Sequence, residues 1–252
     1  MVRLLFILTT LAASPVFAAS AEDLVKDGLA AEARLETGPA LRFFLEADKL
    51  KPNDPFILQK IARQYSDSVV DTRNEAEKKR LAQTALDYSL RAVRLDPTNP
   101  ENVLSVAVSH GKLAVYSDTR TKIQYSRLIK EEAERALALN PNYDWAHHVL
   151  GRWHYEVASL GPTTRFFVRL VYGGLPSASN DAAIVHLEKA VALAPQTLAH
   201  HLELGFAYLE AGRDGDARAA FERGLAFPSR EKHDEDAKAR AQRALSRLAS
   251  AA

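Results

Sequence analysis

The sequence predicts an all-α protein: a right-handed superhelical solenoid of about five helix-turn-helix units, followed by a C-terminal capping helix. The first observation behind this prediction is a repeated ending, an amphipathic helical pattern that stops at a proline. It occurs at Pro52, Pro97, Pro141, Pro195 and Pro228. One such helix cannot bury its apolar face alone. Each repeated helix therefore needs a partner helix beside it.

The second observation is a small residue at the same position in the first helix of every unit, counted from the preceding proline. These residues are Gly28, Ala62, Ala107, Gly151 and Gly205. The second helices carry small residues as well, at Ala40, Ala85, Ala183 and Ala217. Small residues on both helices let their backbones approach closely. The predicted units are about 21–54, 55–99, 100–143, 144–197 and 198–229, with the capping helix at about 231–249.

Residues 1–18 are predicted to be a cleaved signal peptide. Arg3 is followed by an apolar run, and the segment ends in Val16-Phe17-Ala18, which suits signal peptidase. A membrane-spanning helix needs about 20 apolar residues, and this run is shorter. The sequence therefore predicts a secreted or periplasmic protein whose repeat domain covers residues 19–252.

Charge and composition argue against several classes of function. Residues 1–18 hold one of the 33 basic residues and no acidic one, so 32 basic residues face 32 acidic ones in the remainder. This balance argues against a nucleic-acid partner. The chain has no cysteine, which excludes thiolate metal sites and a cysteine nucleophile. Because no G-x-S-x-G, H-E-x-x-H or Gly-rich phosphate loop occurs, we predict a non-catalytic protein without a cofactor.

The repeated positions resemble the consensus of tetratricopeptide repeats. The matches are Leu150, Gly151, Ala183, Leu187, Ala190 and Pro195 in the fourth unit, and Leu204, Gly205, Tyr208, Ala217 and Phe221 in the fifth. The third unit departs from the consensus at Ile129 and Ala133, and Gly224 stands where the fifth unit should have alanine. The resemblance implies a concave surface, formed by the first helices of the units, that binds a partner.

A narrower resemblance is to the regulator of microtubule dynamics protein family. It rests on HHVLGRWHYEVASL, on an insertion that ends in GLPSAS, and on the terminal helix that follows FPSREKHDEDAKAR. The resemblance implies a tetratricopeptide-like protein that is not an enzyme. Members of the family act in eukaryotic cells, some of them tethered to mitochondrial or reticulum membranes. Because the predicted signal peptide departs from the family, we expect that its microtubule role does not transfer to this chain.

The histidines of the fourth and fifth units are predicted to be structural. His147, His154 and His201 occupy repeat positions that point between the two helices of a unit. Metal binding is the alternative, but adjacent residues on a helix point about 100° apart, so His147 and His148 cannot converge on one ion. A metal site would need His148 to meet His200 from the next unit, and we predict none. Asp144, ahead of the seventh predicted helix, is interpreted as an N-cap.

The candidate binding site is the groove lined by the first helices. Its predicted residues are Phe56, Gln59, Arg63, Leu104, Val108, Lys112, Trp145, His148, Arg152, Tyr155, Leu202 and Phe206. This apolar lining with a few cations suits a protein or peptide partner that carries a carboxylate. The alternative partner is a lipid with an anionic head group, which would bind in the same groove. Two further alternatives are that other parts of the chain cover the groove, and that Arg63 and Arg152 pair with local acids such as Asp67 and Glu156.

The insertion at 161–179 is predicted to contain a short helix near Thr164–Tyr172. Phe166, Phe167, Leu170 and Val171 would share one side of this helix, with Arg165 and Arg169 on another. We expect the aromatic side to be packed, because adjacent phenylalanines on a protein surface need cover. Contact with a membrane through Arg165–Tyr172 is the alternative.

Overall fold

The computed structural model describes residues 19–250, and this part of the chain forms twelve α-helices and no strand. The helices are α1 (Ala21–Ala33), α2 (Thr37–Leu50), α3 (Pro55–Asp71), α4 (Glu75–Leu95), α5 (Pro100–Val115), α6 (Thr119–Leu139), α7 (Asp144–Ala158), α8 (Pro162–Tyr172), α9 (Asn180–Leu193), α10 (Leu198–Glu210), α11 (Asp214–Leu225) and α12 (Asp234–Ser250). The predicted all-α solenoid is confirmed.

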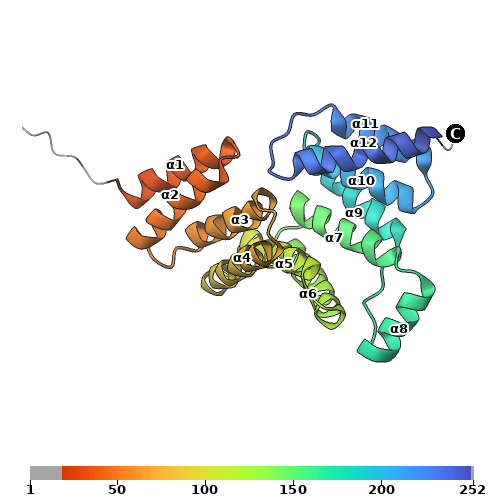
Figure 1. Ribbon diagram of the computed structural model, residues 1–252, viewed down its shortest axis with the longest axis horizontal. Helices are drawn as coiled ribbons and strands as arrows, with labels where there is room; N and C mark the ends of the chain where they lie inside the picture. Colours follow the sequence, from red (N-terminus) through yellow and green to blue (C-terminus); the bar gives the residue numbers. More distant parts are fainter. Residues whose placement is uncertain (1–18, 251–252) are drawn as a thin grey trace, which may run out of the picture.

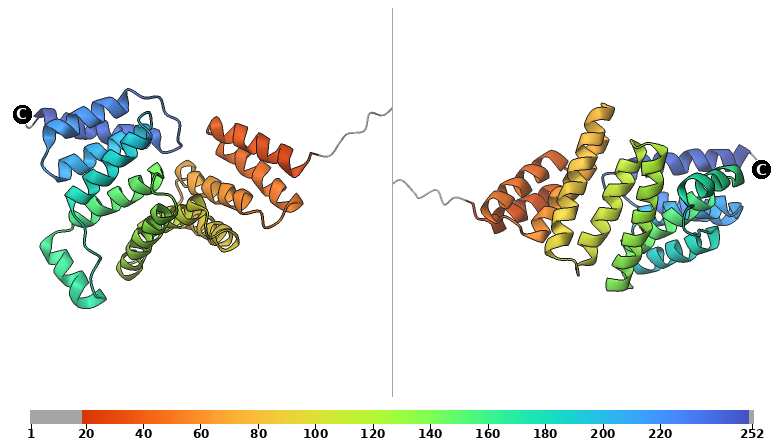
Figure 2. Two further views of the ribbon diagram at one scale, coloured as in Figure 1. Left: turned by 180° about the vertical axis from the view of Figure 1, so that it is seen from behind. Right: turned by 90° about the horizontal axis from the view of Figure 1, so that it is seen from below.

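The helices form five antiparallel pairs that follow one another along an arc (Figure 1). The pairs are α1/α2, α3/α4, α5/α6, α7/α9 and α10/α11. The second helix of each of the first four pairs also packs against the first helix of the next pair, which continues the stack. Helix α12 lies across α10 and α11 at the end of the stack, and it begins at Asp234, later than the predicted position 231. Figure 2 shows the same order of pairs from two further directions.

Polar side chains and prolines set where the first helices begin. Asp54 precedes α3 and Asn99 precedes α5, and each side chain accepts hydrogen bonds from backbone N–H groups of the first turn. A proline follows each cap, at a position where the missing N–H costs nothing. The seventh helix differs from our prediction. Its N-cap is Tyr143, so Asp144 is the first helical residue, and its carboxylate accepts a hydrogen bond from His200.

Close approach within the pairs depends on the glycines of the first helices. A Cβ atom placed on Gly205 would lie 2.5 Å from the Phe221 ring, and one on Gly28 would lie 2.7 Å from Phe44. Both phenylalanines are fully buried. The aromatic ring of the second helix therefore occupies the space that a side chain on the first helix would need.

The buried apolar residues form four separate clusters along the solenoid. The cluster of the C-terminal units joins α7, α9, α10, α11 and α12, while the cluster of the first unit joins α1 and α2 to α3. Each part of the chain is thus stabilised mainly by its neighbours, as expected of a repeat protein. Among the described residues, no helix is both long enough and apolar enough to cross a membrane.

Helix α8 extends away from the stack between α7 and α9 (Figure 1), and its apolar side is exposed. The helix exists, but our expectation that its aromatic side is packed is wrong. Phe166 is 68% exposed and Leu170 is 72% exposed, while only Val168 of the helix is buried. The reason is local: Gly161 begins the helix, and Gly173 ends it in the left-handed conformation (φ 77°), so the chain leaves the stack and returns without laying α8 along another helix.

Candidate functional site

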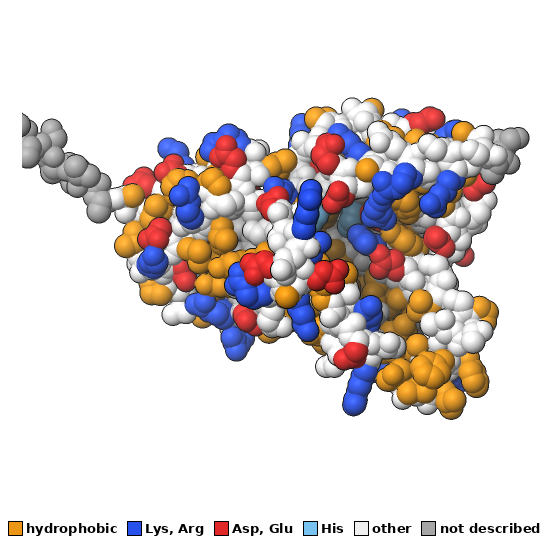
Figure 3. All heavy atoms as spheres, viewed as in Figure 1, with side chains coloured by type: hydrophobic (Ala, Val, Ile, Leu, Met, Phe, Trp, Pro, Cys, Tyr) orange, Lys and Arg blue, Asp and Glu red, His pale blue; other side chains and the backbone are white. Residues whose placement is uncertain are grey.

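The concave face of the solenoid encloses a cavity of about 570 Å³. Helices α3, α5 and α7 contribute most of its wall, and α10, α12 and the segment before α12 contribute further residues, with Ser89 of α4, Ile129 of α6 and Tyr143 at the start of α7. In the space-filling view the surface is hollowed between the middle helices and the C-terminal ones (Figure 3). This size lies within the range of small-molecule and cofactor pockets.

Eight of the twelve predicted groove residues line this cavity. They are Gln59, Arg63, Leu104, Val108, Lys112, Trp145, His148 and Arg152. These eight come from α3, α5 and α7, so the structure brings three neighbouring units together at one site. Their role in binding a partner stays a prediction.

The other four predicted residues lie elsewhere. Phe56 is 43% exposed at the start of α3, with Lys60 above its ring. Tyr155 and Leu202 are buried, and Leu202 packs against Gly224 of α11. Phe206 lies between the Phe221 ring and the guanidinium of Arg240 from α12. The capping helix therefore covers the side of α10 that a longer solenoid would leave open.

Several cavity residues were not predicted from the sequence. Among them are Tyr143, Trp153, Glu203, Glu231, His233, Asp234, Asp236, Ala237 and Arg240. Glu231 contacts Arg63 although 168 residues separate them in the chain. The sequence predicts the run REKHDED, residues 230–236, as the start of the capping helix, and nothing in its pattern indicates a contact with the second unit.

Arg63 and Arg152, the two arginines predicted for the groove, are paired with acids. Arg63 lies 2.5 Å from Glu231, 3.4 Å from Glu32 and 3.9 Å from Asp67, and Arg152 lies 2.7 Å from Glu156. Local pairing, one of the alternatives at the sequence level, is therefore present. Burial by itself would lower the pKa of Arg63, but the neighbouring carboxylates raise it above its ordinary value, so this side chain stays charged.

Glu203 holds α7, α10 and α12 together beneath the cavity. The side chain is 6% exposed, and it accepts hydrogen bonds from the Tyr155 hydroxyl and, at 3.2 Å, from Arg240. Arg152 lies 3.5 Å from the same carboxylate. Burial acts to raise the pKa of Glu203, but Arg152 and Arg240 bring it below its ordinary value. A buried carboxylate with three polar partners of this kind fixes the positions of the helices.

Lys112 is a different kind of cation. Its ammonium donates to Nε2 of His233 at 2.6 Å, and among the described residues it forms no ion pair within 4.0 Å. Burial lowers the pKa of Lys112 to about 8. Burial also raises the pKa of Asp67, the carboxylate whose charge acts most strongly on Lys112, to about 6. Lys112 is therefore mostly charged at pH 7.

The histidines pair across helices. His148 and His200 share a hydrogen bond between their Nδ1 atoms at 3.0 Å, and His200 Nε2 lies 2.9 Å from the Asp144 carboxylate. Trp145 packs against both rings. Burial lowers the pKa of His148 to about 3, so the ring is neutral at pH 7.

His148 and His200 thus meet, as a metal site would require, but their facing nitrogens bind each other. Within the described part of the chain no group of three or more His, Cys, Asp or Glu side chains is arranged to hold a metal ion. On the other side of α7, His147 meets His186 at 2.9 Å between Nδ1 atoms, and His154 stacks on the same ring. His147 and His154 thus face His186 of α9, between the two helices of their unit, as their repeat positions predicted, whereas His148 lines the cavity.

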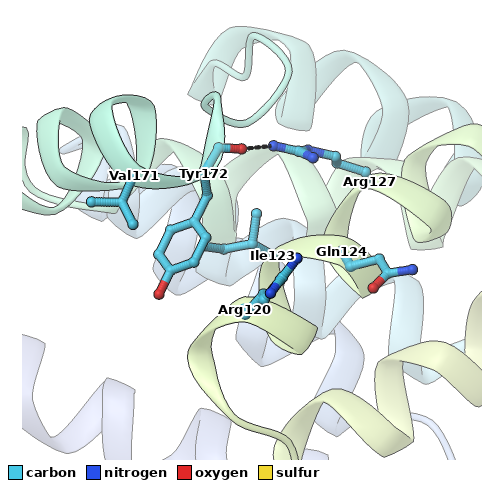
Figure 4. Close-up of a pocket in the computed structure, with 6 residues that line it drawn as sticks. All are labelled: Arg120, Ile123, Gln124, Arg127, Val171 and Tyr172. Carbon is cyan, nitrogen blue, oxygen red and sulfur yellow. Dashed lines mark hydrogen bonds between the residues drawn. The ribbon is translucent and has the colours of Figure 1, made fainter.

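A second hollow, of about 580 Å³, lies between α6 and α8. Only six residues line it: Arg120, Ile123, Gln124, Arg127, Val171 and Tyr172 (Figure 4). Arg127 donates to the backbone carbonyls of Tyr172 and Gly174, which ties the C-terminal end of α8 to α6. We take the concave cavity as the candidate site because it joins several units and contains both apolar and charged side chains.

Comparison with known proteins gives a family and a fold. The profile of the family described as regulator of microtubule dynamics protein 1-3 matches residues 19–249. Regulator of microtubule dynamics protein 3 of Xenopus laevis is 31% identical over 55% of this chain and 30% of its own length. Regulator of microtubule dynamics protein 2 of Homo sapiens is 27% identical over 84% of this chain and 53% of its own length. The chain thus spans about half the length of the human relative and less of the frog relative.

Among solved structures, a thermophilic tetratricopeptide repeat protein of Thermus thermophilus superposes with a TM-score of 0.65. The two chains are 22% identical, and the match covers 90% of this chain and 99% of the other. This similarity concerns the fold, and it agrees with the tetratricopeptide-like units predicted from the sequence.

The predicted secreted or periplasmic location is wrong. The matching relatives are eukaryotic proteins named for the regulation of microtubules, which are polymers of the cell interior. The predicted signal peptide, residues 1–18, lies outside the described residues. Export was the reason to expect that the family's microtubule role does not apply to this chain, and without it that expectation has no support.

Proposed function

We propose that this chain, which belongs to the regulator of microtubule dynamics protein 1-3 family, is a non-catalytic adaptor that holds a segment of a partner protein in its concave cavity. The observation that carries the proposal is the composition of the cavity wall. Leu104, Val108 and Trp145 give it an apolar side, and Lys112 lies beside them without an ion-pair partner among the described residues. An apolar side chain next to a carboxylate would suit this wall.

The arrangement of units supports a peptide rather than a compact small molecule. Helices α3, α5 and α7 come from three consecutive units, so the wall is elongated along the stack. An extended segment can contact several units at once, whereas a compact molecule would reach only part of the wall. The paired state of the arginines is compatible with this function, since Arg63 and Arg152 are fixed in position before a partner arrives.

Val108 offers a direct test, because it lines the cavity and is 38% exposed. Peptides are first selected from a random library for binding to the full chain. The selected peptides should bind Val108→Asp at least roughly tenfold more weakly, because the new carboxylate is placed on the apolar side of the cavity. The matched control is Val185→Asp, at a position on α9 that is 63% exposed and outside the cavity, and it should bind like the unchanged chain.

Equal loss in both variants, or no loss in either, would contradict the proposal. Phospholipid is the competing ligand class for this groove. Native mass spectrometry of the freshly purified chain would favour that alternative if it found a bound phospholipid that Val108→Asp releases and Val185→Asp retains.

The names of the relatives point to microtubules as the first protein partner to test. If the cavity binds a tubulin segment, the chain should sediment with assembled microtubules, and Val108→Asp should reduce the bound fraction while Val185→Asp does not. Absence of sedimentation would exclude this partner and leave the cavity to another protein.

A further inference from the structure

The segment Ser229–His233 occupies one end of the cavity. It connects α11 to α12 and extends across the concave face to α3, as the loop ahead of α12 shows in Figure 1. Glu231 reaches Arg63 of α3 at 2.5 Å, and Lys232 reaches Asp71 of the same helix at 2.8 Å. The C-terminal end of the solenoid thus touches its second unit from inside the curve.

The contacts of this segment with α3 and α5 are polar. Besides the two ion pairs, His233 accepts a hydrogen bond from Lys112 and lies 3.6 Å from Asp67. Of residues 229–233, none belongs to the buried apolar clusters or packs against one of them. Half-exposed ion pairs of this kind are weak, since water and salt compete for both partners.

The shape of the segment does not depend on the cavity. The Asp234 carboxylate accepts hydrogen bonds from the backbone N–H groups of Arg230 and Glu231, each at 2.8 Å. Asp234 itself is 3% exposed at the start of α12. The segment is therefore preformed by its own helix, and release from α3 would leave its fold intact.

Charge around Arg63 indicates what could replace the segment. Lys60 lies 3.0 Å from Glu32 and neutralises it. Asp67 lies 3.9 Å from Arg63 and acts on Lys112 only through its charge, so these two cations outnumber it by one, and Glu231 supplies a second carboxylate beside Arg63. The neighbouring Asp71 accepts Lys232, so α3 presents a site for an acidic residue directly followed by a basic one.

We propose that Ser229–His233 is a built-in occupant of the cavity, and that a protein partner displaces it with a segment in which an acidic residue is followed by a basic one. This inference rests on the proposed function, because it concerns the same cavity. A partner must then compete with the segment, so its apparent affinity is reduced by the fraction of molecules in which the cavity is open.

The probe is a peptide with the sequence of residues 228–234, PSREKHD, titrated into the full chain. Trp145 lines the cavity, and the Trp153→Phe background leaves it as the remaining one of two tryptophans, so its fluorescence reports binding. The open form is the double variant Glu231→Ala/Lys232→Ala. We expect it to bind the peptide at least roughly tenfold more tightly than the parent chain, as relief of competition requires.

The matched control is Glu222→Ala/Arg223→Ala, which removes the same two charges from exposed positions of α11. It should bind the peptide like the parent chain. Adding Arg63→Ala to the open form should abolish the gain, and so should placing Glu231→Ala in the peptide itself. Circular dichroism of each variant checks that the helices remain.

Equal affinity of the parent chain and the open form would overturn the inference, as would binding that persists after Arg63→Ala. A library peptide that depends on Val108 but binds both forms equally would leave the proposed function standing and overturn the inference alone. Absence of any peptide binding to either form would overturn both.

Discussion

The fifth unit and helix α8 both carry phenylalanines on amphipathic helices, but these side chains are buried in the fifth unit and exposed on α8. Phe221 of α11 is fully buried against α10, whereas Phe166 and Phe167 of α8 are 68% and 51% exposed. The difference is the presence of a partner helix. Gly205 lets α10 approach the Phe221 ring closely, while α8 runs between two glycines that direct it away from the stack. An amphipathic pattern thus shows which side of a helix is apolar, but it does not show whether another helix packs against that side.

The largest expected effect separates these phenylalanines by stability. Phe221→Ala should lower the free energy of unfolding by about 3 to 5 kcal/mol, because it removes a fully buried ring and leaves a cavity between α10 and α11. Phe166→Ala is the matched control and should change it by less than about 0.5 kcal/mol, since the ring is mostly in water. Urea denaturation followed by circular dichroism measures both. A large loss in Phe166→Ala would mean that another surface covers α8 in solution.

The next effect concerns close approach within the fifth unit. Gly205→Ala places a Cβ atom 2.5 Å from the Phe221 ring, so the ring or the helix must shift, at a cost of about 1 to 3 kcal/mol. Gly215→Ala, in the first turn of α11, meets no atom within 4 Å and should be neutral or stabilise by up to about 1 kcal/mol. Thermal unfolding of the two variants compares them directly. If both behaved alike, helix propensity rather than packing would control the unit.

The repeat pattern predicted the fold because it records local packing. Each proline, each small residue and each aromatic partner lies within one unit, so Gly205 and Phe221 can be matched from the sequence alone. The same logic places Arg63 and Lys112 on the concave side of α3 and α5, and both line the cavity. Most of the predicted groove residues followed from position in the repeat for this reason.

The remainder depends on contacts that skip units. Phe206 follows the repeat pattern, but Arg240 of α12 covers it because the solenoid ends there. Glu231 reaches Arg63 only because the stack curves back on itself, and curvature accumulates from small rotations between units that no single position encodes. For α8, Gly161 and Gly173 mark the ends of the helix in the sequence, but they do not tell whether another helix covers its apolar side.

Acid should distinguish the packed region from α8, through the pKa of His148. This ring faces His200 and Glu203 from α10, and Arg152 and Asp144 from its own helix. Burial lowers its pKa to about 3, against about 6.5 in an unfolded chain. Between pH 6.5 and pH 3, His148 is therefore protonated in the unfolded chain but stays neutral in the folded chain. Stability is complete above pH 6.5 and should fall as the pH drops towards 3, by up to about 1.4 kcal/mol per pH unit for this group.

Urea unfolding between pH 7 and pH 5 measures the slope of stability against pH. This slope reports how many more protons the unfolded chain binds than the folded one, and His148→Gln should reduce that number by nearly one near pH 5. His186 on α9 adds to the slope in the same direction, because burial and the neighbouring His147 and His154 lower its pKa to about 4. Helix α8 contains no histidine or carboxylate. The amide exchange of α8, corrected for the intrinsic rate, should stay constant as the pH falls, while α7 and α10 lose protection. Equal loss of protection in all three helices would show that acid does not act through the buried histidines of the packed region.

The smallest effect on stability comes from the anchor of α8. Arg127 of α6 donates to the carbonyls of Tyr172 and Gly174, and it is the main polar tie at the C-terminal end of this helix (Figure 4). Arg127→Ala should therefore let α8 open locally and speed trypsin cleavage after Arg169 several-fold. Global unfolding should change by less than about 1 kcal/mol, because Val168 is the only buried side chain of the helix.

Arg120→Ala is the matched control for this experiment. Arg120 lines the same hollow but forms no hydrogen bond with α8 in the described part of the chain, so its loss should leave cleavage after Arg169 unchanged. The digestion is followed by mass spectrometry of the fragments, at a trypsin concentration where the stack stays intact. If Arg127→Ala and Arg120→Ala accelerate cleavage equally, the general positive charge of α6, rather than the two hydrogen bonds, positions α8. If neither variant accelerates cleavage, the hydrogen bonds of Arg127 do not hold α8 against the stack. The fifth unit and α8 would then differ only in how much apolar surface each buries.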